Sequence, residues 1–422
     1  MGMTMIDKIL ARKSGRDTVR PGDIVVCDVD MAVQLDLIWT VAGHTYPPKR
    51  IANPDRVAVV LDHTIPAPTV HDASGHARAR AFAEEWGIEN FYDVGRHGIC
   101  HQVILENGLA LPGTVLACTD SHTIASGVFN CAARGLGPIE MLSIVCTGKT
   151  WYKSSPTIRY ELVGTKPASV FGKDVFLHIA GVHGSHEGHN VEFGGPGLES
   201  LTLDDRATLA TMCAEISANF ATFPADRLVI DHLHDITDRP FEPVESDPDA
   251  DYADLRTIDL DRLVAHVARP DFVPGNTLPV RELPETPIQQ AFVGSCANGK
   301  LNDIRIAAQV LEGRQVKKGV RLLVTPASQQ VYLEAVRAGY VEKLVQAGAV
   351  VTNSTCGACY GGHMGVLAPD ETCITSSTRN FKGRMGSSDA RIYIGSSATV
   401  AASAVEGHIV DPSPYLQEAV HA

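Results

Sequence analysis

Short runs of aliphatic and β-branched residues alternate along the chain with longer stretches in which apolar residues recur at helical spacing. The short runs, which we expect to be strands, lie at residues 57–61, 114–117, 158–163, 291–293, 321–324 and 349–352. The helical stretches lie at residues 77–86, 138–147, 204–217, 302–311, 328–338 and 398–404. Strands that alternate with helices predict an α/β fold with mainly parallel sheets and helices on both faces.

The chain has 422 residues, more than one hydrophobic core usually supports, so several domains are expected. Residues 231–254 are rich in Asp, Glu, Pro and His, which predicts a solvated linker or a long loop. Residues 150–157 mark a second expected break. We therefore expect two or three domains, and the family resemblance given below implies three, at residues 1–155, 156–285 and 286–422.

Composition limits the partners and the compartment. The formal net charge of −13 argues against nucleic acid or an anionic membrane surface as a partner. No apolar run approaches the roughly 20 residues that a membrane-spanning helix needs, and no signal peptide is visible. The ten scattered cysteines indicate reduced thiols and therefore a cytoplasmic location. An anionic substrate would need arginines placed locally.

Three cysteines lie in loops of glycine and small polar residues: Cys296 in GSCANG, and Cys356 and Cys359 in TCGACYGG. A [4Fe–4S] cluster usually takes four thiolates, so three would leave one iron open to substrate as a Lewis acid. A redox-active CxxC pair and a structural zinc site are the alternatives. A redox pair would not account for Cys296, and the chain has no second CxxC for zinc. Spacing favours the cluster and leaves both alternatives open.

Acidic residues and histidines follow two of the predicted strands. Asp62 and His63 come after residues 57–61, Asp120 and His122 come after residues 114–117, and His101 lies in a further segment that looks buried. A carboxylate fixes the tautomer of a histidine and raises its basicity, which suits proton transfer. A structural histidine near a turn is the alternative for each one taken singly. Because strand ends converge in an open α/β sheet, the set together favours a shared site.

Three further charged residues suggest a binding site. Glu215 lies in an otherwise apolar helical stretch, so its carboxylate needs a partner such as a histidine. Arg379 and Arg384 lie in one glycine-containing loop, where guanidinium forks suit carboxylates. A solvated basic loop is the alternative.

A histidine-rich segment contains His183, His186 and His189, interleaved with glycines. A metal site is one interpretation. The glycines and the spacing argue against a rigid helical face, so a flexible loop is the favoured prediction.

Taken in order, these motifs resemble those of the aconitase superfamily, and the likeness is greatest to the large catalytic subunits of 3-isopropylmalate dehydratase and homoaconitase. The likeness runs from about residue 19 to residue 412. It rests on DHTIPAP (62–68), GICHQVILENG (98–108), TDSHT (119–123), VEFGGPG (191–197), GSCANGK (294–300), CGACYGGHMGVL (356–367) and RNFKGRMGS (379–387). The resemblance implies three α/β/α domains of the aconitase type around a central cluster cleft.

The resemblance also implies roles for single residues. Cys296, Cys356 and Cys359 would ligate a [4Fe–4S] cluster that has one iron without a cysteine ligand. Asp62 and His63 would protonate the leaving hydroxyl group.

By the same resemblance, His101 pairs with Glu215, and Asp120 pairs with His122. The positions that contact substrate or cluster are Gln34, Ser121, Asn298, Arg379 and Arg384.

Aconitases of full length carry a swivelling fourth domain with a catalytic serine, and nothing after residue 412 could form it. The resemblance therefore implies a heterodimer in which a separate small subunit supplies that domain. Four positions depart from the family pattern and bear on the substrate: Thr211 and Thr378 stand in place of Asn, Ala297 in place of Thr, and Lys300 in place of Arg.

The implied activity is that of a hydro-lyase that dehydrates and rehydrates a branched hydroxy-dicarboxylate. Isomerisation of isopropylmalate in leucine biosynthesis is the first hypothesis. Homoaconitate, methylmalate or citraconate, and dimethylmalate are alternative substrates. An RNA-binding iron sensor is disfavoured by the net charge and the missing fourth domain. An inactive structural partner is disfavoured because the cysteines, histidines and arginines are all present.

Overall fold

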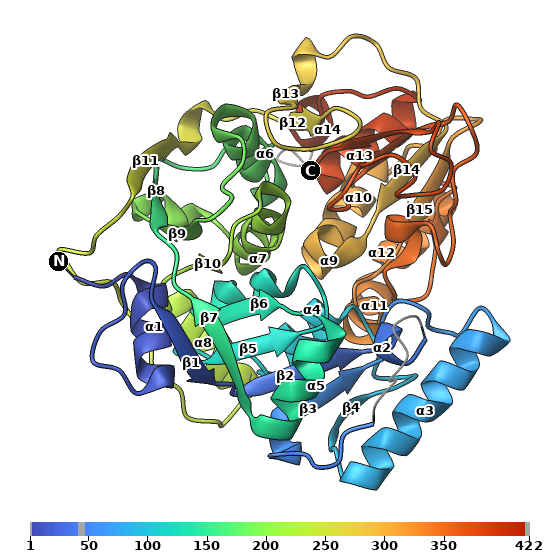
Figure 1. Ribbon diagram of the computed structural model, residues 1–422. Coiled ribbons are helices and arrows are strands. Elements are labelled where there is room, and N and C mark those ends of the chain that lie inside the picture. Colours follow the sequence, from blue (N-terminus) through green and yellow to red (C-terminus); the bar gives the residue numbers. More distant parts are fainter. Residues whose placement is uncertain (1, 41–46, 418–422) are drawn as a thin grey trace. The chain divides into compact units, whose positions relative to one another are not determined.

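The computed structural model describes residues 2–40 and 47–417, and its contacts divide the chain into two compact units (Figure 1). Unit 1 comprises Met1–Val163 and His186–Ile258, and unit 2 comprises Gly164–Ser185 and Asp259–Ala422. The finer division into three domains stays a prediction. Among the described residues, no helix is long and apolar enough to cross a membrane.

Unit 1 is built on a five-stranded parallel sheet with the order β4-β3-β2-β5-β6. Its strands are β2 (Met31–Leu35), β3 (Val57–Val60), β4 (Asn90–Tyr92), β5 (Val115–Cys118) and β6 (Ala132–Gly135). The chain runs from β2 through β3 to β4 at one edge and then returns to β5 and β6 on the other side. The direction of winding therefore reverses between β2 and β5, which is where open α/β sheets bind ligands.

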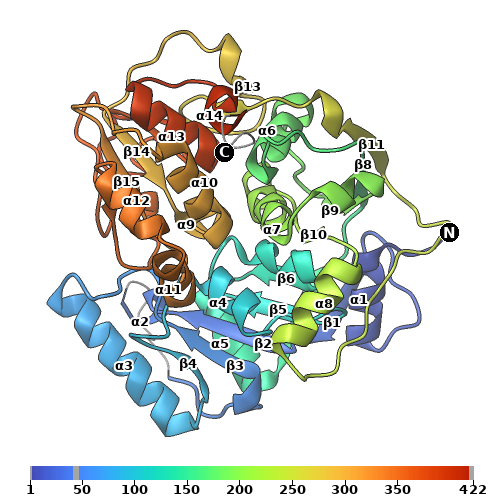
Figure 2. The same ribbon diagram turned by 180° about the vertical axis from the view of Figure 1, so that it is seen from behind.

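Both faces of this sheet are buried, because alternate side chains of each strand point to opposite sides. One hydrophobic cluster packs the sheet against α1 (Met5–Ser14), α3 (Val70–Trp86) and α5 (Pro138–Thr147). The cluster on the opposite face includes α4 (Cys100–Glu106), η2 (Thr123–Phe129) and α8 (Arg227–Ile236), which are seen in Figure 2. Apolar runs that the sequence places at residues 57–61 and 114–117 are thus central parallel strands.

Two smaller sheets complete unit 1. A four-stranded sheet has the order β10-β9-β8-β11 and contains β8 (Thr157–Val163), β9 (Asn190–Gly194), β10 (Ala221–Thr222) and β11 (Asp254–Asp259). A two-stranded antiparallel sheet joins β1 (Ile24–Asp28) to β7 (Lys149–Lys153). Helix α7 (Leu203–Met212) continues into the 3-10 turn η4 (Cys213–Ile216).

The expected loops differ from the observed elements in two places. Strand β7 occupies the start of the segment predicted as a break at residues 150–157. The predicted linker at residues 231–254 begins inside α8, because Asp226 caps that helix and Val229 and Leu233 bury their side chains in the core. The acidic residues of α8 lie between these apolar positions and hide the helical pattern.

Unit 2 is built on a seven-stranded sheet with the order β13-β12-β18-β17-β14-β15-β16. Its strands are β12 (His266–Ala268), β13 (Thr277–Pro279), β14 (Gln290–Val293), β15 (Arg321–Val324), β16 (Val350–Val351), β17 (Thr372–Thr375) and β18 (Arg391–Ile394). The five strands from β18 to β16 are parallel, and β12 and β13 are antiparallel. The winding reverses between β14 and β17.

Helices cover one face of this sheet and an irregular segment covers the other. The first face packs against α10 (Leu301–Leu311), α11 (Gln329–Arg337), α12 (Tyr340–Gln346) and α13 (Ser397–Glu406). On the second face, Ala358, Cys359, Leu367 and Met385 pack against the strands. Helix α6 (Gly172–His183) contacts β12 and β13. The remaining helical segments are α2 (Leu37–Thr40), α9 (Ser295–Asn298), α14 (Ser413–Gln417), η1 (Pro54–Arg56), η3 (Pro196–Ser200), η5 (Leu260–Arg262), η6 (Val280–Glu282) and η7 (Gly357–Tyr360). The predicted α/β fold with mainly parallel sheets is confirmed.

Candidate active site

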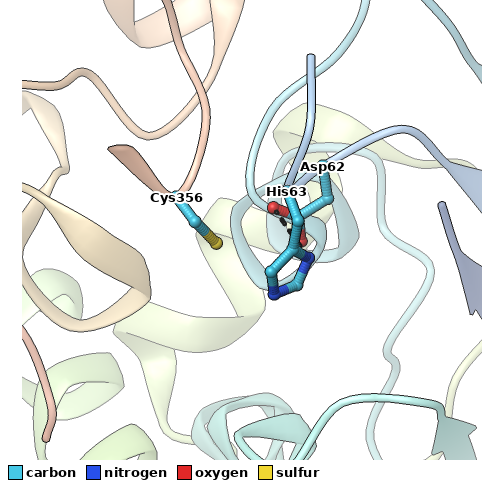
Figure 3. Close-up of side chains that lie close together, drawn as sticks. All are labelled: Asp62, His63 and Cys356. Carbon is cyan, nitrogen blue, oxygen red and sulfur yellow. Dashed lines mark ion pairs between the residues drawn. The ribbon is translucent and has the colours of Figure 1, made fainter. Parts of the chain in front are cut away.

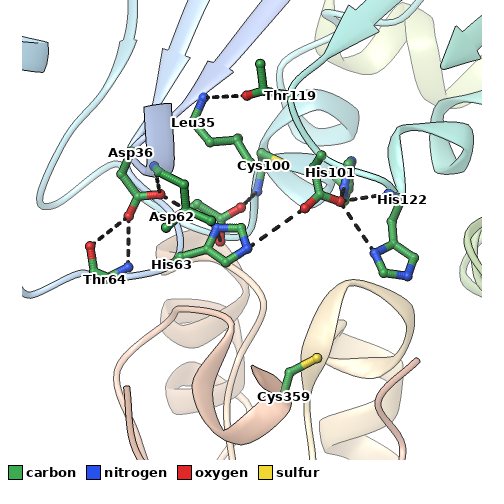
Figure 4. Close-up of polar contacts among 12 residues, drawn as sticks. Leu35, Asp36, Asp62, His63, Thr64, Cys100, His101, Thr119, His122 and Cys359 are labelled. Carbon is green, nitrogen blue, oxygen red and sulfur yellow. Dashed lines mark hydrogen bonds and ion pairs between the residues drawn. The ribbon is translucent and has the colours of Figure 1, made fainter. Parts of the chain in front are cut away.

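The acidic and histidine side chains of unit 1 gather at the carboxyl ends of neighbouring strands, as Figure 4 shows. They follow β2, β3 and β5 or begin α4: Asp36, Asp62, His63, His101, Asp120 and His122. Parallel strands deliver these side chains to one edge because their carboxyl ends point the same way. The convergence predicted from the sequence is therefore confirmed for unit 1.

His63 lies among three carboxylates. Its Nδ1 is 3.6 Å from Asp36 Oδ1 and 3.7 Å from Asp62 Oδ1, the second of which is drawn in Figure 3. Its Nε2 is 3.9 Å from Asp120 Oδ2. Burial alone would lower the pKa of His63, but these carboxylates outweigh burial and raise the pKa to about 10. At neutral pH His63 therefore holds a proton.

The two acids beside His63 have opposite tendencies. Burial would raise the pKa of Asp36, but hydrogen bonds with His63 and His76 outweigh it and lower the pKa below its usual range. Asp36 also accepts two hydrogen bonds from Thr64, at 2.8 Å from the backbone amide and 3.1 Å from the hydroxyl. Burial raises the pKa of Asp62, although the charge of His63 opposes the change. Asp36 is thus the fixed anion and Asp62 is the acid that more readily takes a proton.

Asp36 and His76 were not identified by our sequence analysis. Asp36 follows β2 just as Asp62 follows β3, so its position after a strand was a usable signal. The β2 segment was not recognised as a strand. His76 lies within α3, and nothing in the local sequence points to its contact with the Asp36 site.

A second chain of hydrogen bonds links His101, Asp120, His122 and Glu215. His101 Nε2 is 2.7 Å from Asp120 Oδ1, which also accepts the backbone amide of His122 at 2.7 Å. His122 Nε2 is 2.8 Å from Glu215 Oε1. Burial would raise the pKa of Asp120, but hydrogen bonds with His101 and His122 outweigh it and hold the pKa well below its usual value.

The expected pairing of His101 with Glu215 is wrong. The backbone amide of His122 donates to Asp120 Oδ1, and Nδ1 of the His122 ring lies 3.4 Å from the same oxygen. With Nδ1 on the side of Asp120, Nε2 of the same ring contacts Glu215 in η4. The prediction that Glu215 needs a histidine partner is confirmed, with His122 as the partner.

Among the buried polar groups of unit 1 that lack a hydrogen-bond partner within the described residues, two belong to the candidate site residues Gln34 and His101. They are the side-chain amide of Gln34 in β2, at both its nitrogen and its oxygen, and Nδ1 of His101. A buried amide normally has partners, so Gln34 is suited to a ligand at this edge. Ser121, between Asp120 and His122, is exposed.

In unit 2 the three candidate cysteines lie in loops after parallel strands. Cys296 follows β14 in the short helix α9, after Ser295, whose φ of 83° is strained for a residue with a side chain. Cys356 follows β16, and Cys359 lies in η7. Gly357 between them has a φ of 60°, and a Cβ there would lie 2.6 Å from the hydroxyl of Thr325. Only glycine permits this close turn.

Cationic side chains support the cysteine loops. Arg384 Nε donates to the Cys359 carbonyl at 2.8 Å, and a terminal nitrogen of the same guanidinium lies 3.6 Å from Cys359 Sγ. The Lys300 ammonium donates to the carbonyls of Ala297 and Cys296. These contacts fix the backbone of the loops that carry Cys296 and Cys359.

The donor chemistry of these loops fits an iron–sulfur cluster. All three cysteines are free thiols, and Cys296 and Cys356 are partly accessible. Cys131 and Cys373 behave differently, since burial raises the pKa of each to about 12. Those two are core thiols that stay protonated.

The arginine loop of unit 2 is supported by a residue that sequence analysis missed. Lys173 in α6 is fully buried, and its ammonium donates to the carbonyls of Ser376 and Ser377 at 3.0 Å each. These residues lead from β17 to Arg379. No local pattern marks Lys173, because its contacts are more than 200 positions away in the sequence.

The structure describes the surroundings of three residues that depart from the family pattern. The Thr211 hydroxyl donates to the carbonyl of Ala207 at 2.6 Å, within its own helix. The Thr378 hydroxyl is buried and has no hydrogen-bond partner among the described residues. Lys300 supports the Cys296 loop, as described above. Neither threonine therefore reproduces the reach of an asparagine amide.

The histidine-rich segment is not a flexible loop at its centre. His186 is buried, and its Nε2 is 2.7 Å from the Tyr160 hydroxyl and 3.0 Å from a nitrogen of Arg256. His189 is hydrogen-bonded through Nδ1 to the Glu187 carbonyl at 3.0 Å. The prediction of a flexible loop is wrong for His186, which has a structural role in unit 1.

Comparison with known proteins shows the same motifs elsewhere. A model of the aconitase family (aconitate hydratase) matches residues 49–287 and 279–407. The 3-isopropylmalate dehydratase large subunit of Mycolicibacterium smegmatis is 59% identical over 97% of each chain. The 3-isopropylmalate dehydratase large subunit 1 of Methanopyrus kandleri is 41% identical over 99% of this chain and 100% of its own. The structure of aconitase X from Thermococcus kodakaraensis aligns over 91% of each chain with 13% identity and a TM-score of 0.48, too distant to add to these matches.

Proposed function

This chain belongs to the aconitase family, and from that membership we propose that it is the large subunit of an iron–sulfur hydro-lyase that interconverts 2- and 3-isopropylmalate. The family implies a [4Fe–4S] cluster. The Mycolicibacterium smegmatis relative, which is 59% identical over 97% of each chain, is a 3-isopropylmalate dehydratase large subunit by name, and this supports isopropylmalate as the substrate. Homoaconitate, methylmalate or citraconate, and dimethylmalate remain the alternatives to test.

The observation that carries the proposal is the buried acid–base set at the strand ends of unit 1. A dehydration needs an acid that arrives protonated at the leaving hydroxyl. The carboxylates around His63 raise its pKa to about 10, so it carries a proton at neutral pH. Asp62, whose pKa is raised by burial, can return a proton to His63. We therefore assign His63 and Asp62 to protonation of the leaving hydroxyl group.

The chain of His101, Asp120, His122 and Glu215 is assigned to holding and moving protons during the reverse hydration. Asp120 stays ionised because both histidines hydrogen-bond to it. Its carboxylate then fixes the tautomer of His101, while Glu215 does the same for His122. This gives two oriented imidazoles in one buried network.

Cys296, Cys356 and Cys359 are the residues that would hold the cluster. When bound, a cluster with one iron free of cysteine supplies a Lewis acid for the substrate hydroxyl and carboxylate. Asn298 is proposed to face the substrate through its Oδ1, which lacks a hydrogen-bond partner among the described residues. Its Nδ2 is already anchored, at 2.8 Å, on Asp303.

Substrate carboxylates are assigned to Arg379 and Arg384. The buried lysine Lys173 positions the loop that carries Arg379. Arg384 has a double role in this proposal: its guanidinium supports Cys359, and it is also assigned to a substrate carboxylate. Gln34 and Ser121 are proposed as further substrate contacts.

The relatives' names as large subunits support a separate small subunit as the partner of this chain. In the proposed enzyme that subunit carries the swivelling domain, whose serine removes the carbon-bound proton. The chain alone then has the acid, the cluster ligands and the anion site, but not the carbon base.

The test is reconstitution. The chain is loaded with iron and sulfide under anaerobic conditions and mixed with its small subunit. The mixture is then assayed with 2-isopropylmalate, homocitrate, citramalate and 2,3-dimethylmalate in parallel. We expect turnover of 2-isopropylmalate above the other three and little turnover without the small subunit. Preference for another substrate would overturn the substrate assignment, and full activity of the isolated chain would overturn the two-subunit assignment.

A further inference from the structure

A cavity of about 760 Å³ lies within unit 1. Its wall comes from the β1–β7 sheet, the loop between β6 and α5, and residues 154–156; the members used below are Arg134, Glu140, Trp151, Tyr152, Lys153 and Asn219. None of the residues assigned to the hydro-lyase reaction lines it. Its volume falls in the range of roughly 300–1,000 Å³ that is typical of sites for small metabolites.

Arg134, at the end of β6, is a half-buried cation in this wall. One terminal nitrogen donates to Asn219 Oδ1 at 3.2 Å. No carboxylate among the described residues forms an ion pair with Arg134, and burial lowers the pKa of its guanidinium. A charge withdrawn from water without a counter-charge is costly, and an anionic ligand would remove that cost.

Tyr152, on β7, presents the second unsatisfied group. Its side chain is buried against Phe220, with ring centroids 5.4 Å apart, and its hydroxyl has no hydrogen-bond partner among the described residues. Buried tyrosine hydroxyls usually have a partner. Asn219 is already fixed, since its amide nitrogen donates to Ser155 Oγ at 2.8 Å. The wall thus combines one unpaired cation, one unpaired hydroxyl and an anchored amide.

Two arginines that line other cavities of unit 1 are paired with carboxylates, whereas Arg56 and Arg239 line the cavity of Arg12 without an ion pair among the described residues. Arg159 contacts Glu161 at 2.8 Å and Glu192 at 2.7 Å, and Arg12 contacts Glu242 at 3.1 Å. In those cavities the protein supplies its own anion. The cavity at Arg134 differs because a ligand would have to supply it.

We propose that this cavity binds the oxyanion group, carboxylate or phosphate, of a small metabolite, with the Arg134 guanidinium as the principal donor; the Tyr152 hydroxyl is closed to solvent and makes no contact with the ligand. Lys153 adds a cation at the exposed rim. Glu140 opposes the ligand: it is exposed near the start of α5, where its carboxylate would lie 2.5 Å from a Cβ placed on Gly137. Its negative charge limits the affinity for anions.

The test follows Trp151, which lies in the cavity wall and is exposed. The full chain is labelled with 5-fluorotryptophan, and Trp151→Phe assigns the fluorine resonance. Sodium succinate and inorganic phosphate are the two anionic probes, and the neutral diamide of succinate is the control. We expect a saturable shift of the Trp151 resonance with at least one anion and none with the diamide. The anion that binds more tightly identifies the ligand class.

Three variants of the wall should change the affinity in predicted directions. Arg134→Gln should weaken binding roughly tenfold or more, since hydrogen bonds to a charged group are lost. Lys153→Gln should weaken binding severalfold, because it removes the cation at the exposed rim. Glu140→Gln should strengthen binding. Arg56→Gln, an exposed arginine outside the cavity wall, should have no effect.

The outcomes separate this site from the reaction site. Arg379→Lys should leave the Trp151 titration unchanged even where it impairs turnover. A flat titration with both anions overturns the proposal, and so does equal affinity of the wild type and Lys153→Gln, which remains informative if Arg134→Gln fails to fold. If the small subunit shifts the Trp151 resonance and neither anion does, the surface is a protein contact and the proposal is overturned.

Discussion

The reactive side chains of unit 1 bond to one another, whereas those of unit 2 are held mainly by backbone groups. Both units use a parallel sheet whose winding reverses near the centre, and both place reactive residues in loops after its strands. In unit 1, Asp120 holds two histidines by hydrogen bonds of 2.7 Å. In unit 2, Arg384 holds the Cys359 loop through a carbonyl, and the Cys359 thiol has no carboxylate or histidine partner among the described residues of that unit.

The difference shows which half of the chemistry the polypeptide completes by itself. Charges of opposite sign satisfy each other in unit 1, so that network forms as the unit folds. Ser354, Ser377 and Thr378 of unit 2, which flank the cysteine and arginine loops, keep buried hydroxyls without partners among the described residues. Unit 2 is therefore the part whose order we expect to depend on a bound group. Four predictions test this contrast, beginning with the largest effect.

Replacing a cluster cysteine should remove activity altogether. Cys296→Ser, Cys356→Ser and Cys359→Ser should each lose the bound iron, because a cluster left with two thiolates is not retained. Iron content and the visible absorption of the anaerobically reconstituted protein are the measurements. Hydrogen exchange of residues 31–135 should stay as in the wild type, since the acid–histidine network needs no metal.

The matched control is Cys146→Ser, a partly accessible cysteine of unit 1 outside the candidate set. It should keep both iron and activity. A cysteine variant that retains four irons would show that its thiol is not a ligand, and protection lost in unit 1 would contradict the independence of the two networks.

Asp120→Asn should lower turnover by roughly two to four decades, the usual worth of an acid–base group, while iron content stays normal. An amide cannot hold both histidines as a carboxylate does, so the orientation of His101 and the charge of the network are lost. The assay is turnover of the reconstituted enzyme beside an iron determination. Asp17→Asn, at an exposed position of unit 1, is the control and should behave as the wild type. A fully active Asp120→Asn enzyme would return the network to a structural role.

Arg379→Lys and Arg384→Lys should each lower kcat/KM for a dicarboxylate about tenfold or more, because lysine keeps the charge but loses the planar fork. Arg384→Lys should also lose iron faster in air, since Arg384 supports Cys359. Arg379→Lys should not. The exposed Arg337→Lys in α11 is the control. If the two variants lose iron at the same rate, the double role of Arg384 is contradicted.

The smallest effect is a pair of opposite pH dependences. In unit 1 the pKa of His63 is raised from 6.5 to about 10, so its contribution to stability is present below pH 6.5 and is lost as the pH rises to 10. In unit 2 burial lowers the pKa of His178 from 6.5 to about 4, with His266 and His183 adding to the effect. Its contribution is present above pH 6.5 and is lost as the pH falls to 4.

Urea unfolding of the wild type, His63→Gln and His178→Gln across pH 4–10 measures both. The difference between wild type and His63→Gln should shrink on the alkaline side. The difference for His178→Gln should shrink on the acid side. Two differences that change in the same direction would show that at least one of these shifts has the wrong sign.

Much of the fold could be predicted because strand and helix patterns are local. Predicted residues 138–147 and 321–324 coincide with α5 and β15, since apolar spacing and a terminal glycine mark them without reference to the rest of the chain. Strand β7 was missed, because a two-stranded sheet has one exposed face and because a lysine stands at each end of the strand. Helix α8 was hidden by its acidic residues for the same kind of reason.

The sequence by itself determined the chemistry: three cysteines in small-residue loops, acids and histidines after strands, and two arginines in one glycine-containing loop. The tertiary structure decided the partners. His122 rather than His101 reaches Glu215, Asp36 and His76 join the His63 site, Lys173 supports the arginine loop, and Arg134 meets Tyr152 at a cavity wall. Residue type and spacing are local properties of a chain, but a hydrogen bond depends on which strand ends lie beside each other and in what register, and those are set by contacts between residues tens to hundreds of positions apart.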